Sequence, residues 1–319
     1  MKTYLLKRIG LMIVTFFVIF FLLFVLIRMQ VKPEVVYGPE QELEAARLEA
    51  LGYNENVVTQ FFIYIKNCLH GDLGVSLKID YMAPVSSLMA EKLVPSLLIN
   101  LYSVLLSIPA GFALGVYAAT HQNKWQDALI GLGIMLLISI PSLVLAFLLQ
   151  YALGYKGGFP LVVSSLYEAG GFFSWEMIRS QFLPVLTLCL PSIAFLARNV
   201  RAEMAEELQS PQITFAKSLG VSKRKLIYGY ALKSTLVPLL PQLVSMTVGI
   251  FSGSFIVEQI FSVPGIGKLM IQSINRLDYD VFIACSMFYA LIGLLSGIVT
   301  DVTYHLIDPR IRMGGRKYE

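Results

Sequence analysis

Long apolar runs alternate with shorter polar segments along the whole chain. The hydrocarbon core of a membrane is about 30 Å thick, so a helix of roughly 20 apolar residues crosses it. Six runs approach that length, and we expect each to form a membrane-spanning helix: Ile9–Ile27, Ser96–Ala119, Ala128–Leu153, Phe182–Ala197, Ser234–Val257 and Val281–Ile307. The fourth run is the shortest, and Pro184 and Pro191 interrupt it. The pattern predicts an all-α membrane protein with six transmembrane helices.

The composition agrees with a membrane protein and excludes several functions. Of the 319 residues, 56% are hydrophobic and 14% are charged, whereas soluble domains carry about 25% charged residues. The net charge of +4 indicates no surface for a polyanion, so we expect no nucleic-acid partner. The three cysteines and three histidines are scattered, which argues against a disulfide framework and a metal site.

The polar segments predict the orientation of the chain. If the N-terminus is cytoplasmic, the inner segments carry more Lys and Arg than the outer ones, in a shorter total length. Cytoplasmic loops show such an excess, so both termini are predicted to be cytoplasmic. We interpret the first apolar run as an uncleaved anchor, because Arg28-Met29-Gln30 offers no small-residue cleavage site.

This orientation divides the chain into segments. We expect an N-terminal transmembrane helix at 1–27, an extracytoplasmic insertion at 28–95, a five-helix core at 96–307 and a cytoplasmic tail at 308–319. The insertion begins with an acidic stretch, 32–53, and contains helix-like runs at Gln41–Ala50 and Val57–Leu69.

The spans carry little chemistry of their own. Asp301 and His305 lie in the last turns of the sixth run, where a polar pair at the membrane surface is a simpler interpretation than a proton relay. The run Gly265–Lys268 lacks the first glycine and the final Ser or Thr of a phosphate-binding loop. The sequence has no GxSxG motif and no carboxylate pair inside a span. We therefore expect no enzymatic activity, no bound cofactor and an energy source outside the chain.

Small residues and prolines suggest how the spans pack. Three pairs of glycines stand four residues apart, and each pair would let two helix backbones approach closely: Gly111/Gly115, Gly249/Gly253 and Gly293/Gly297. Prolines such as Pro109 and Pro141 are expected to kink their helices.

The segment 198–233 is the most informative polar segment. Its pattern predicts a helix that extends the fourth span to Gln209, followed by Ser210 as N-cap and Pro211 at the first helical position. A short helix then runs to about Leu219, and Gly220 fits the left-handed position that ends it. Ser222 can begin a further helix, Lys223–Leu232. An exposed short helix between two turns is suited to docking into a groove on another protein.

Motifs along nearly the whole chain resemble one family. The run Ala216-Lys217-Ser218-Leu219-Gly220 is similar to the "EAA" coupling loop of ABC-importer permeases, in the oligopeptide/dipeptide/nickel branch. Five further stretches resemble that branch in the same order along the chain: Leu5–Val14, Gly71–Ser76 with Pro84-Val85, Tyr230–Pro238, Val257–Gly267 and Asp308–Arg312. The external Gly-Asp-Leu-Gly insertion resembles the first of the two paired permease subunits.

The chain departs from the family pattern at several positions. The first position of the EAA loop is Thr214 rather than an acid, Leu219 replaces a lysine and Tyr230 replaces a histidine. The Gly-Asp-Pro that follows the first span in the family is missing from 28–38. These differences bear on the strength of coupling and on external docking.

The resemblance implies a fold, partners and a location. It implies the type I ABC-importer permease fold, paired with a second homologous permease in a bacterial or archaeal inner membrane. Two cytoplasmic ATPase subunits would hold ATP and Mg, and an extracytoplasmic binding protein would deliver an oligopeptide or dipeptide. This chain would form half of an alternating-access pathway among membrane lipids, with no chemistry of its own.

The resemblance also assigns candidate residues. Those expected to couple to the ATPase are Ser210, Pro211, Thr214, Phe215, Ala216, Lys217, Ser218, Leu219, Gly220, Lys223, Arg224 and Lys225. Ala216 would approach the ATPase groove closely, and the basic residues would face its acids. Those expected to line the pathway are Pro109, Pro141, Ser245, Thr247, Gly249, Ser252 and Ser254.

Other functions remain as alternatives. The same type of complex could import a nickel chelate, glutathione or a sugar-type solute, because nothing in the spans selects the cargo. A stand-alone channel or secondary transporter is a different class and would work without ATPase partners. An intramembrane enzyme lacks paired catalytic groups.

Overall fold

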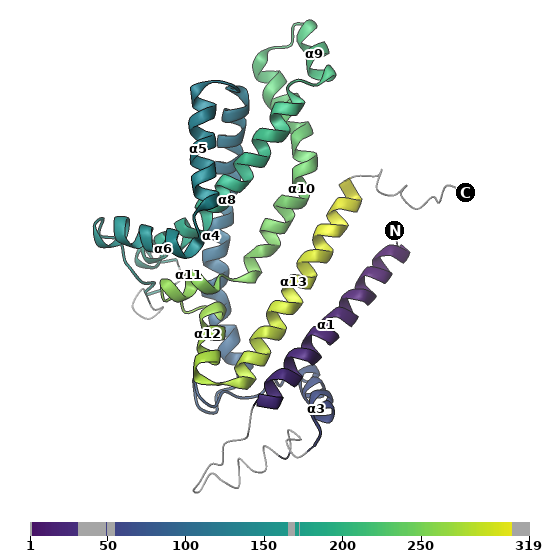
Figure 1. Cartoon of the computed structure of the whole chain (residues 1–319), viewed down its shortest axis with the longest axis vertical. Coiled ribbons are helices and arrows are strands. Elements are labelled where there is room, and N and C mark those ends of the chain that lie inside the picture. The colour runs from purple at the N-terminus through teal and green to yellow at the C-terminus, as the bar shows by residue number, and fades with distance from the viewer. Residues whose placement is uncertain (1, 31–48, 50–54, 165–169, 172, 308–319) are drawn as a thin grey trace. The chain divides into compact units, whose positions relative to one another are not determined.

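The computed structural model describes residues 2–30, 49, 55–164, 170–171 and 173–307. Regular secondary structure in these ranges is helical, and the one β-type pairing is an isolated bridge between Val75 and Pro84. The elements, in chain order (Figure 1), are α1 (Lys2–Gln30), α3 (Val57–Leu69), α4 (Val85–Thr120), α5 (Trp125–Ser139), α6 (Ser142–Leu149), the π-helix η1 (Gln150–Tyr155), α8 (Trp175–Glu207), α9 (Pro211–Ser218), the π-helix η2 (Lys225–Ala231), α10 (Leu232–Val248), the 3₁₀-helix η3 (Gly249–Ser252), α11 (Phe255–Ile260), α12 (Ile266–Arg276) and α13 (Tyr279–Ile307).

Five of these helical segments are long and apolar enough to cross a membrane, and the bent pair formed by α5 with α6–η1 brings the number to six. The prediction of an all-α membrane protein is therefore confirmed. The helix expected at Val57–Leu69 is present as α3. The run Gln41–Ala50, the acidic stretch 32–53 and the motif Asp308–Arg312 lie wholly or largely outside the described residues.

The structure forms two compact units. The first comprises the described parts of Met1–Val94 and Gly265–Leu295, and the second those of Pro95–Pro264 and Ser296–Glu319. The segment boundaries expected from the sequence at 27, 95 and 307 stay predictions.

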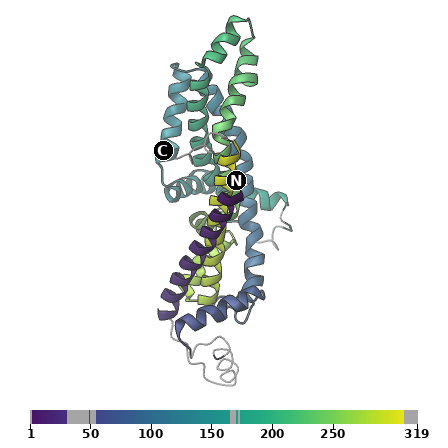
Figure 2. The ribbon, with the colours of Figure 1, turned by 90° about the vertical axis from the view of Figure 1, so that its right-hand side faces the viewer.

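Helix α1 lies beside α3 in the first unit (Figure 2). Aromatic rings fill the contact: Phe20 and Phe24 of α1 are buried with Phe61 and Tyr64 of α3. The ring centroids of Phe20 and Phe61 are 5.3 Å apart, within the range of favourable aromatic pairs. A second cluster in this unit joins the start of α4 to α12 and α13.

The helix α8 is central to the second unit, where it packs against α5, α6, α10 and α11. It continues for 33 residues with Pro184 and Pro191 inside it, so the fourth span is longer than the sequence suggested. Of the three glycine pairs, Gly111/Gly115 lies at a helix contact: a Cβ on Gly111 would meet Leu196 at 2.9 Å, and one on Gly115 would meet Val200 at 2.6 Å.

The other two glycine pairs differ from the expectation. Gly249 begins η3 and Gly253 follows it with a φ of 62°, so they are not one turn apart on a helix. A Cβ on Gly293 or Gly297 would meet nothing within 4 Å among the described residues. Neither pair serves a close helix contact within the described chain.

The third predicted span is sharply bent. The axes of α5 and of the α6–η1 segment differ by 106°. The break falls at Ile140 and Pro141, where both residues leave the helical conformation. A proline disfavours the helical conformation in the residue before it, and the kink expected at Pro141 is present and is large.

Candidate functional site

The predicted coupling loop forms a helical hairpin at one end of the second unit. Helix α8 ends at Glu207 and α9 follows after a short turn, beyond the ends of α4 and α5 (Figures 1 and 2). The Ser210 hydroxyl accepts a hydrogen bond from the Ile213 N–H at 3.4 Å, and Pro211 occupies the first turn of α9. The cap and start expected from the sequence are confirmed.

The end of α9 is also the one expected. Gly220 has a φ of +78°, and its N–H donates to the carbonyl of Lys217 at 3.0 Å. The Val221 N–H donates to the carbonyl of Ala216 at 3.2 Å. This pair of bonds is a Schellman motif, in which a left-handed residue satisfies the last carbonyls of a helix.

The helix after this turn differs in detail from the expectation. The Ser222 carbonyl accepts from the Leu226 N–H at 3.0 Å, so the helix begins where predicted. Residues Lys225–Ala231 are a π-helix, which continues directly into α10. The helix propensities of these residues do not predict a π-helix. Such a wider turn is rare in proteins, and where it occurs it is often at a functional site.

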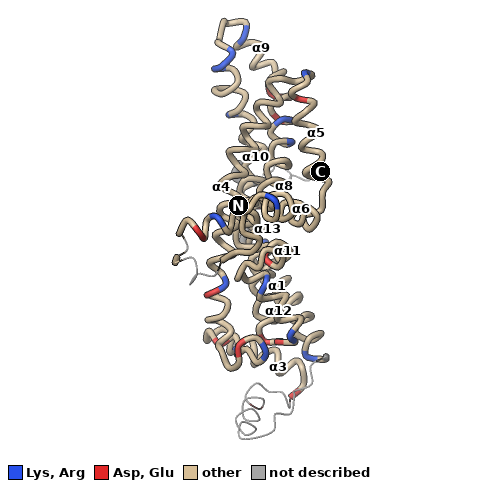
Figure 3. The backbone as a smooth tube through the Cα atoms, turned by 90° about the vertical axis from the view of Figure 1, so that its left-hand side faces the viewer, with Lys and Arg blue, Asp and Glu red and all other residues tan. Residues whose placement is uncertain are grey.

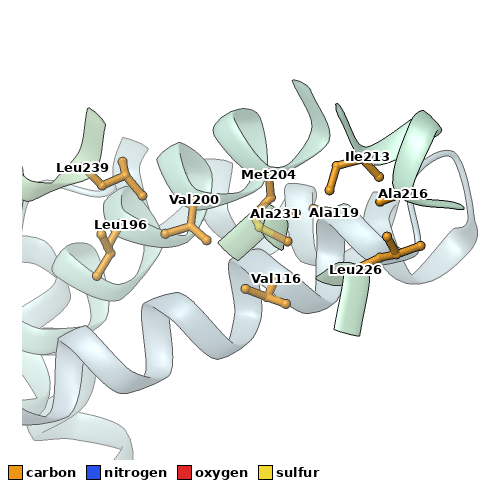
Figure 4. Close-up of a cluster of buried hydrophobic side chains, with 10 residues drawn as sticks. All are labelled: Val116, Ala119, Leu196, Val200, Met204, Ile213, Ala216, Leu226, Ala231 and Leu239. Atoms are coloured by element: carbon orange, nitrogen blue, oxygen red, sulfur yellow. The ribbon is translucent and has the colours of Figure 1, made fainter. Parts of the chain in front are cut away.

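One face of α9 is built into the apolar interior of the unit. Ile213 and Ala216, 5% and 8% exposed, belong to a buried cluster (Figure 4). The other members come from α4, α8, η2 and α10: Val116, Ala119, Leu196, Val200, Met204, Leu226, Ala231 and Leu239. These helices therefore contact α9 either directly or through other members of the cluster. Close packing of this kind transmits displacement rather than absorbing it.

The opposite face of α9 is open. Phe215 and Leu219 are 65% and 67% exposed, and Lys217 and Ser218 are exposed beside them. Ala216 differs from its expected role, because it faces inward and is buried by this chain's own side chains. Exposed large apolar residues on a capped helix are typical of a surface that another protein covers.

Positive charge accompanies this face. Lys223, Arg224 and Lys225 are exposed and follow the turn at Gly220. Figure 3 shows Lys and Arg gathered on the hairpin, whereas α10 is uncharged over most of its length.

A cavity of about 430 Å³ opens at the base of α9, with Lys217 and Lys223 at its edge and Ala119, Ile213 and Leu226 among its apolar walls. Ser210, Pro211 and Thr214 complete the set of predicted coupling residues, and all twelve lie on this hairpin.

The predicted pathway residues lie on several elements. Pro109 is exposed inside α4 and Pro141 is exposed at the bend. The other five follow one another along α10, η3 and the start of α11: Ser245, Thr247, Gly249, Ser252 and Ser254. The Thr247 hydroxyl donates to the Leu243 carbonyl of its own helix at 2.9 Å. Their role in a pathway stays a prediction.

A buried carboxylate in the first unit holds the motif Gly71–Ser76. Asp278 is 2% exposed, and its Oδ2 accepts from the Ser76 hydroxyl at 2.6 Å. The same oxygen accepts from the N–H groups of Leu77, Lys78 and Ile79 at 3.1, 2.9 and 3.1 Å. The sequence analysis missed Asp278, whose one signal is an acidic residue just before the sixth apolar run.

A second buried acid lies in the motif that begins at Val257. Glu258 is 1% exposed, and its Oε1 accepts from the Ser96 hydroxyl at 2.9 Å and from the Ser254 N–H at 3.2 Å. It therefore anchors α11 to α4 within the second unit. The described residues contain no group of three His, Cys, Asp or Glu able to hold a metal ion.

Comparisons with known proteins agree on one family. A family model described as "Binding-protein-dependent transport system inner membrane component" matches residues 111–313. The chain is 32% identical over 317 residues to the dipeptide transport system permease protein DppB of Lactococcus lactis subsp. cremoris (strain MG1363), covering 98% of this chain and 100% of the relative.

Two further relatives extend the comparison. DppB of Bacillus subtilis (strain 168) is 33% identical over 320 residues, covering 98% of this chain and 99% of the relative. The oligopeptide transport system permease protein OppB of Escherichia coli (strain K12) is 34% identical over 261 residues, covering 81% of this chain and 82% of the relative.

Proposed function

Because this chain belongs to the family of binding-protein-dependent transport system inner membrane components, we propose that it is one of the two permease subunits of an ATP-driven importer of dipeptides or oligopeptides. The names of the relatives as dipeptide and oligopeptide permeases support the cargo. The complex comprises this chain, a second homologous permease, two ATPase subunits and an extracytoplasmic binding protein. It lies in a bacterial or archaeal inner membrane, with both termini of this chain cytoplasmic.

The observation that carries this proposal is that α9 has one buried face and one exposed face. Its inner face, with Ile213 and Ala216, packs into the cluster shared by α4, α8, η2 and α10. Its outer face exposes Phe215 and Leu219. An ATPase that binds the outer face therefore moves the spans with it, because the inner face packs into the cluster that these spans share.

Alternating access follows from that attachment. ATP binding closes the ATPase subunits, and the closure carries the two α9 helices of the permease pair toward each other. The spans then rotate as packed bodies and open the pathway outward, and hydrolysis returns them. ATP and Mg are held by the ATPase subunits, and this chain contributes attachment and pathway rather than catalysis.

Co-purification tests the assignment. A tag on this chain, expressed from its native cells, should recover a second permease and two ATPase subunits. The complex with its binding protein in vesicles should show ATP-dependent uptake of a dipeptide, and nickel chelate should not compete. Uptake by this chain alone, without ATPase subunits, would contradict the proposal and favour a stand-alone transporter.

A further inference from the structure

A groove between α5 and α8 takes no part in the function described above. Its volume is about 720 Å³. Three basic residues, Lys124, Arg198 and Arg201, line one end, and apolar positions that include Gly131, Leu132 and Met135 line the rest. The groove is thus basic at one end and apolar along the remainder of its length.

The basic end carries a net positive charge. Arg201 is committed to the buried Asp127: its Nε and Nη2 donate to the two carboxylate oxygens at 2.5 and 2.7 Å. That pair is neutral overall. Lys124 and Arg198 are exposed, and their side chains form no hydrogen bond or ion pair within the described part of the chain. Two cations are therefore left to face a ligand.

The start of α5 lies at the basic end of the groove. The helix begins after Lys124, and no side chain caps its first turn. The N-terminal N–H groups of a helix carry a partial positive charge and bind anions. Lys124 stands at this helix end, and the first turn also contains Asp127, whose charge is balanced by Arg201.

The length of the groove matches one leaflet of a membrane. The lining stretch of α5 runs from Trp125 to Met135, and at about 1.5 Å per residue it is roughly 15 Å long. Half of the hydrocarbon core is about 15 Å. Trp125, 71% exposed, stands at the basic end, where aromatic residues mark the membrane surface.

We propose that this groove binds one anionic phospholipid. Lys124 and Arg198 bind the phosphate, because basic pockets at the cytoplasmic ends of transmembrane helices suit lipid headgroups. An acyl chain lies along Leu132 and Met135 and across Gly131, where a Cβ would meet nothing within 4 Å. A free phosphate would use the basic end alone. The assignment to the inner leaflet rests on the proposed orientation, whereas the preference for an anionic headgroup does not.

Quenching of Trp125 fluorescence tests the proposal. The chain has two tryptophans, so Trp175→Phe leaves Trp125 as the reporter in the full chain. The protein is reconstituted in vesicles with phosphatidylglycerol or phosphatidylcholine brominated on the acyl chains near the headgroup. At equal mole fraction, phosphatidylglycerol should quench more strongly. Replacing Lys124 or Arg198 with Gln should weaken its apparent affinity about fivefold each, whereas Arg224→Gln should not.

A matched pair of glycine variants tests the acyl-chain contact. Gly131 lines the groove and Gly133 does not, yet both have open space at the Cβ position, so leucine should fold at either. Gly131→Leu should reduce quenching by phosphatidylglycerol, and Gly133→Leu should leave it unchanged. Equal quenching of the parent chain by the two lipids would overturn the proposal, as would equal effects of the two glycine variants.

Discussion

At the scale of single residues, Gly220 sets the direction in which the chain leaves α9. Its positive φ is a conformation that costs other L-residues about 1–2 kcal/mol. A Cβ at this position would meet nothing within 4 Å among the described residues, so the requirement comes from the backbone rather than from space. The turn can therefore be altered without disturbing the packing of the spans.

We expect Gly220→Val to uncouple transport from ATP hydrolysis. Valine resists a positive φ, so the turn should open and α9 should lose its fixed angle to η2. Assembly should persist, because the cluster that anchors α9 does not include Gly220. Peptide-stimulated ATPase activity and uptake should both fall, whereas Gly220→Asn should retain most of each, because asparagine tolerates this conformation. Full stimulation in the valine variant would contradict this role.

Asp278 sets the stability of the loop that contains Ser76 and Lys78. Replacing it with alanine removes the acceptor of four hydrogen bonds, three of them from backbone N–H groups. A buried donor left without a partner costs about 1–3 kcal/mol, and here Ser76 is buried whereas the backbone donors are part-buried, so Asp278→Ala should lower the free energy of unfolding by about 2 kcal/mol or more. Thermal unfolding of the purified protein measures the loss, and trypsin should cut sooner after Lys78.

The control for Asp278 is a neighbouring acid in the same loop. Asp80 is exposed, and surface substitutions usually change stability by less than about 0.5 kcal/mol. Asp80→Ala should therefore unfold at nearly the same temperature as the parent protein. A similar loss in both variants would indicate that loop charge matters, rather than the hydrogen bonds to Asp278.

At the scale of elements, local signals were read correctly from the sequence and long-range ones were not. Ser210, Pro211 and Gly220 define α9, because caps and turns depend on a few neighbouring residues. The contact between Asp278 and Ser76 joins positions 202 residues apart, and no local pattern specifies it. The inward direction of Ala216 likewise depends on which helices surround α9.

The prolines show the same limit of prediction from local sequence. Pro141 stands at a bend of 106°, whereas Pro184 and Pro191 lie inside the continuous helix α8. Helix α8 packs against α5, α6, α10 and α11, and neighbouring helices can satisfy the backbone groups that a proline frees. The residue alone indicates where a helix can bend, and the surrounding packing determines whether it does.

The two faces of α9 should respond differently to substitution. Phe215→Ala and Leu219→Ala remove exposed side chains, so both should leave the unfolding temperature of this chain unchanged and weaken its binding to the ATPase subunits. Truncating Ile213 instead opens a cavity in the buried cluster, and such changes cost about 2–5 kcal/mol. Unfolding temperature and recovery of the ATPase on a tagged chain distinguish the two effects. Normal ATPase recovery in the Phe215→Ala, Leu219→Ala double variant would exclude this face as the docking surface.

At the scale of the whole molecule, the few charged residues of the chain are distributed unevenly. The long helices are apolar, and the hairpin of α9 concentrates exposed basic residues next to two exposed apolar ones. A chain built in this way can receive movement at the hairpin of α9. Orientation then decides which side of the membrane the ATPase must occupy.

Labelling with a membrane-impermeant maleimide tests that orientation in intact cells. Ser218→Cys places a thiol on the exposed side of α9, and Asp80→Cys places one in the loop that Asp278 holds. Maleimides react with thiolates, and burial raises the pKa of the native Cys68 thiol to about 11, so its background reaction at pH 7 should be slow and should increase as the pH rises. Cys189 and Cys285 are buried. Intact cells, or protoplasts where an outer layer blocks access, should label Asp80→Cys at once and Ser218→Cys only after the membrane is opened. The reverse order would place α9 outside the cell, away from ATP, and would remove the basis for coupling through this helix.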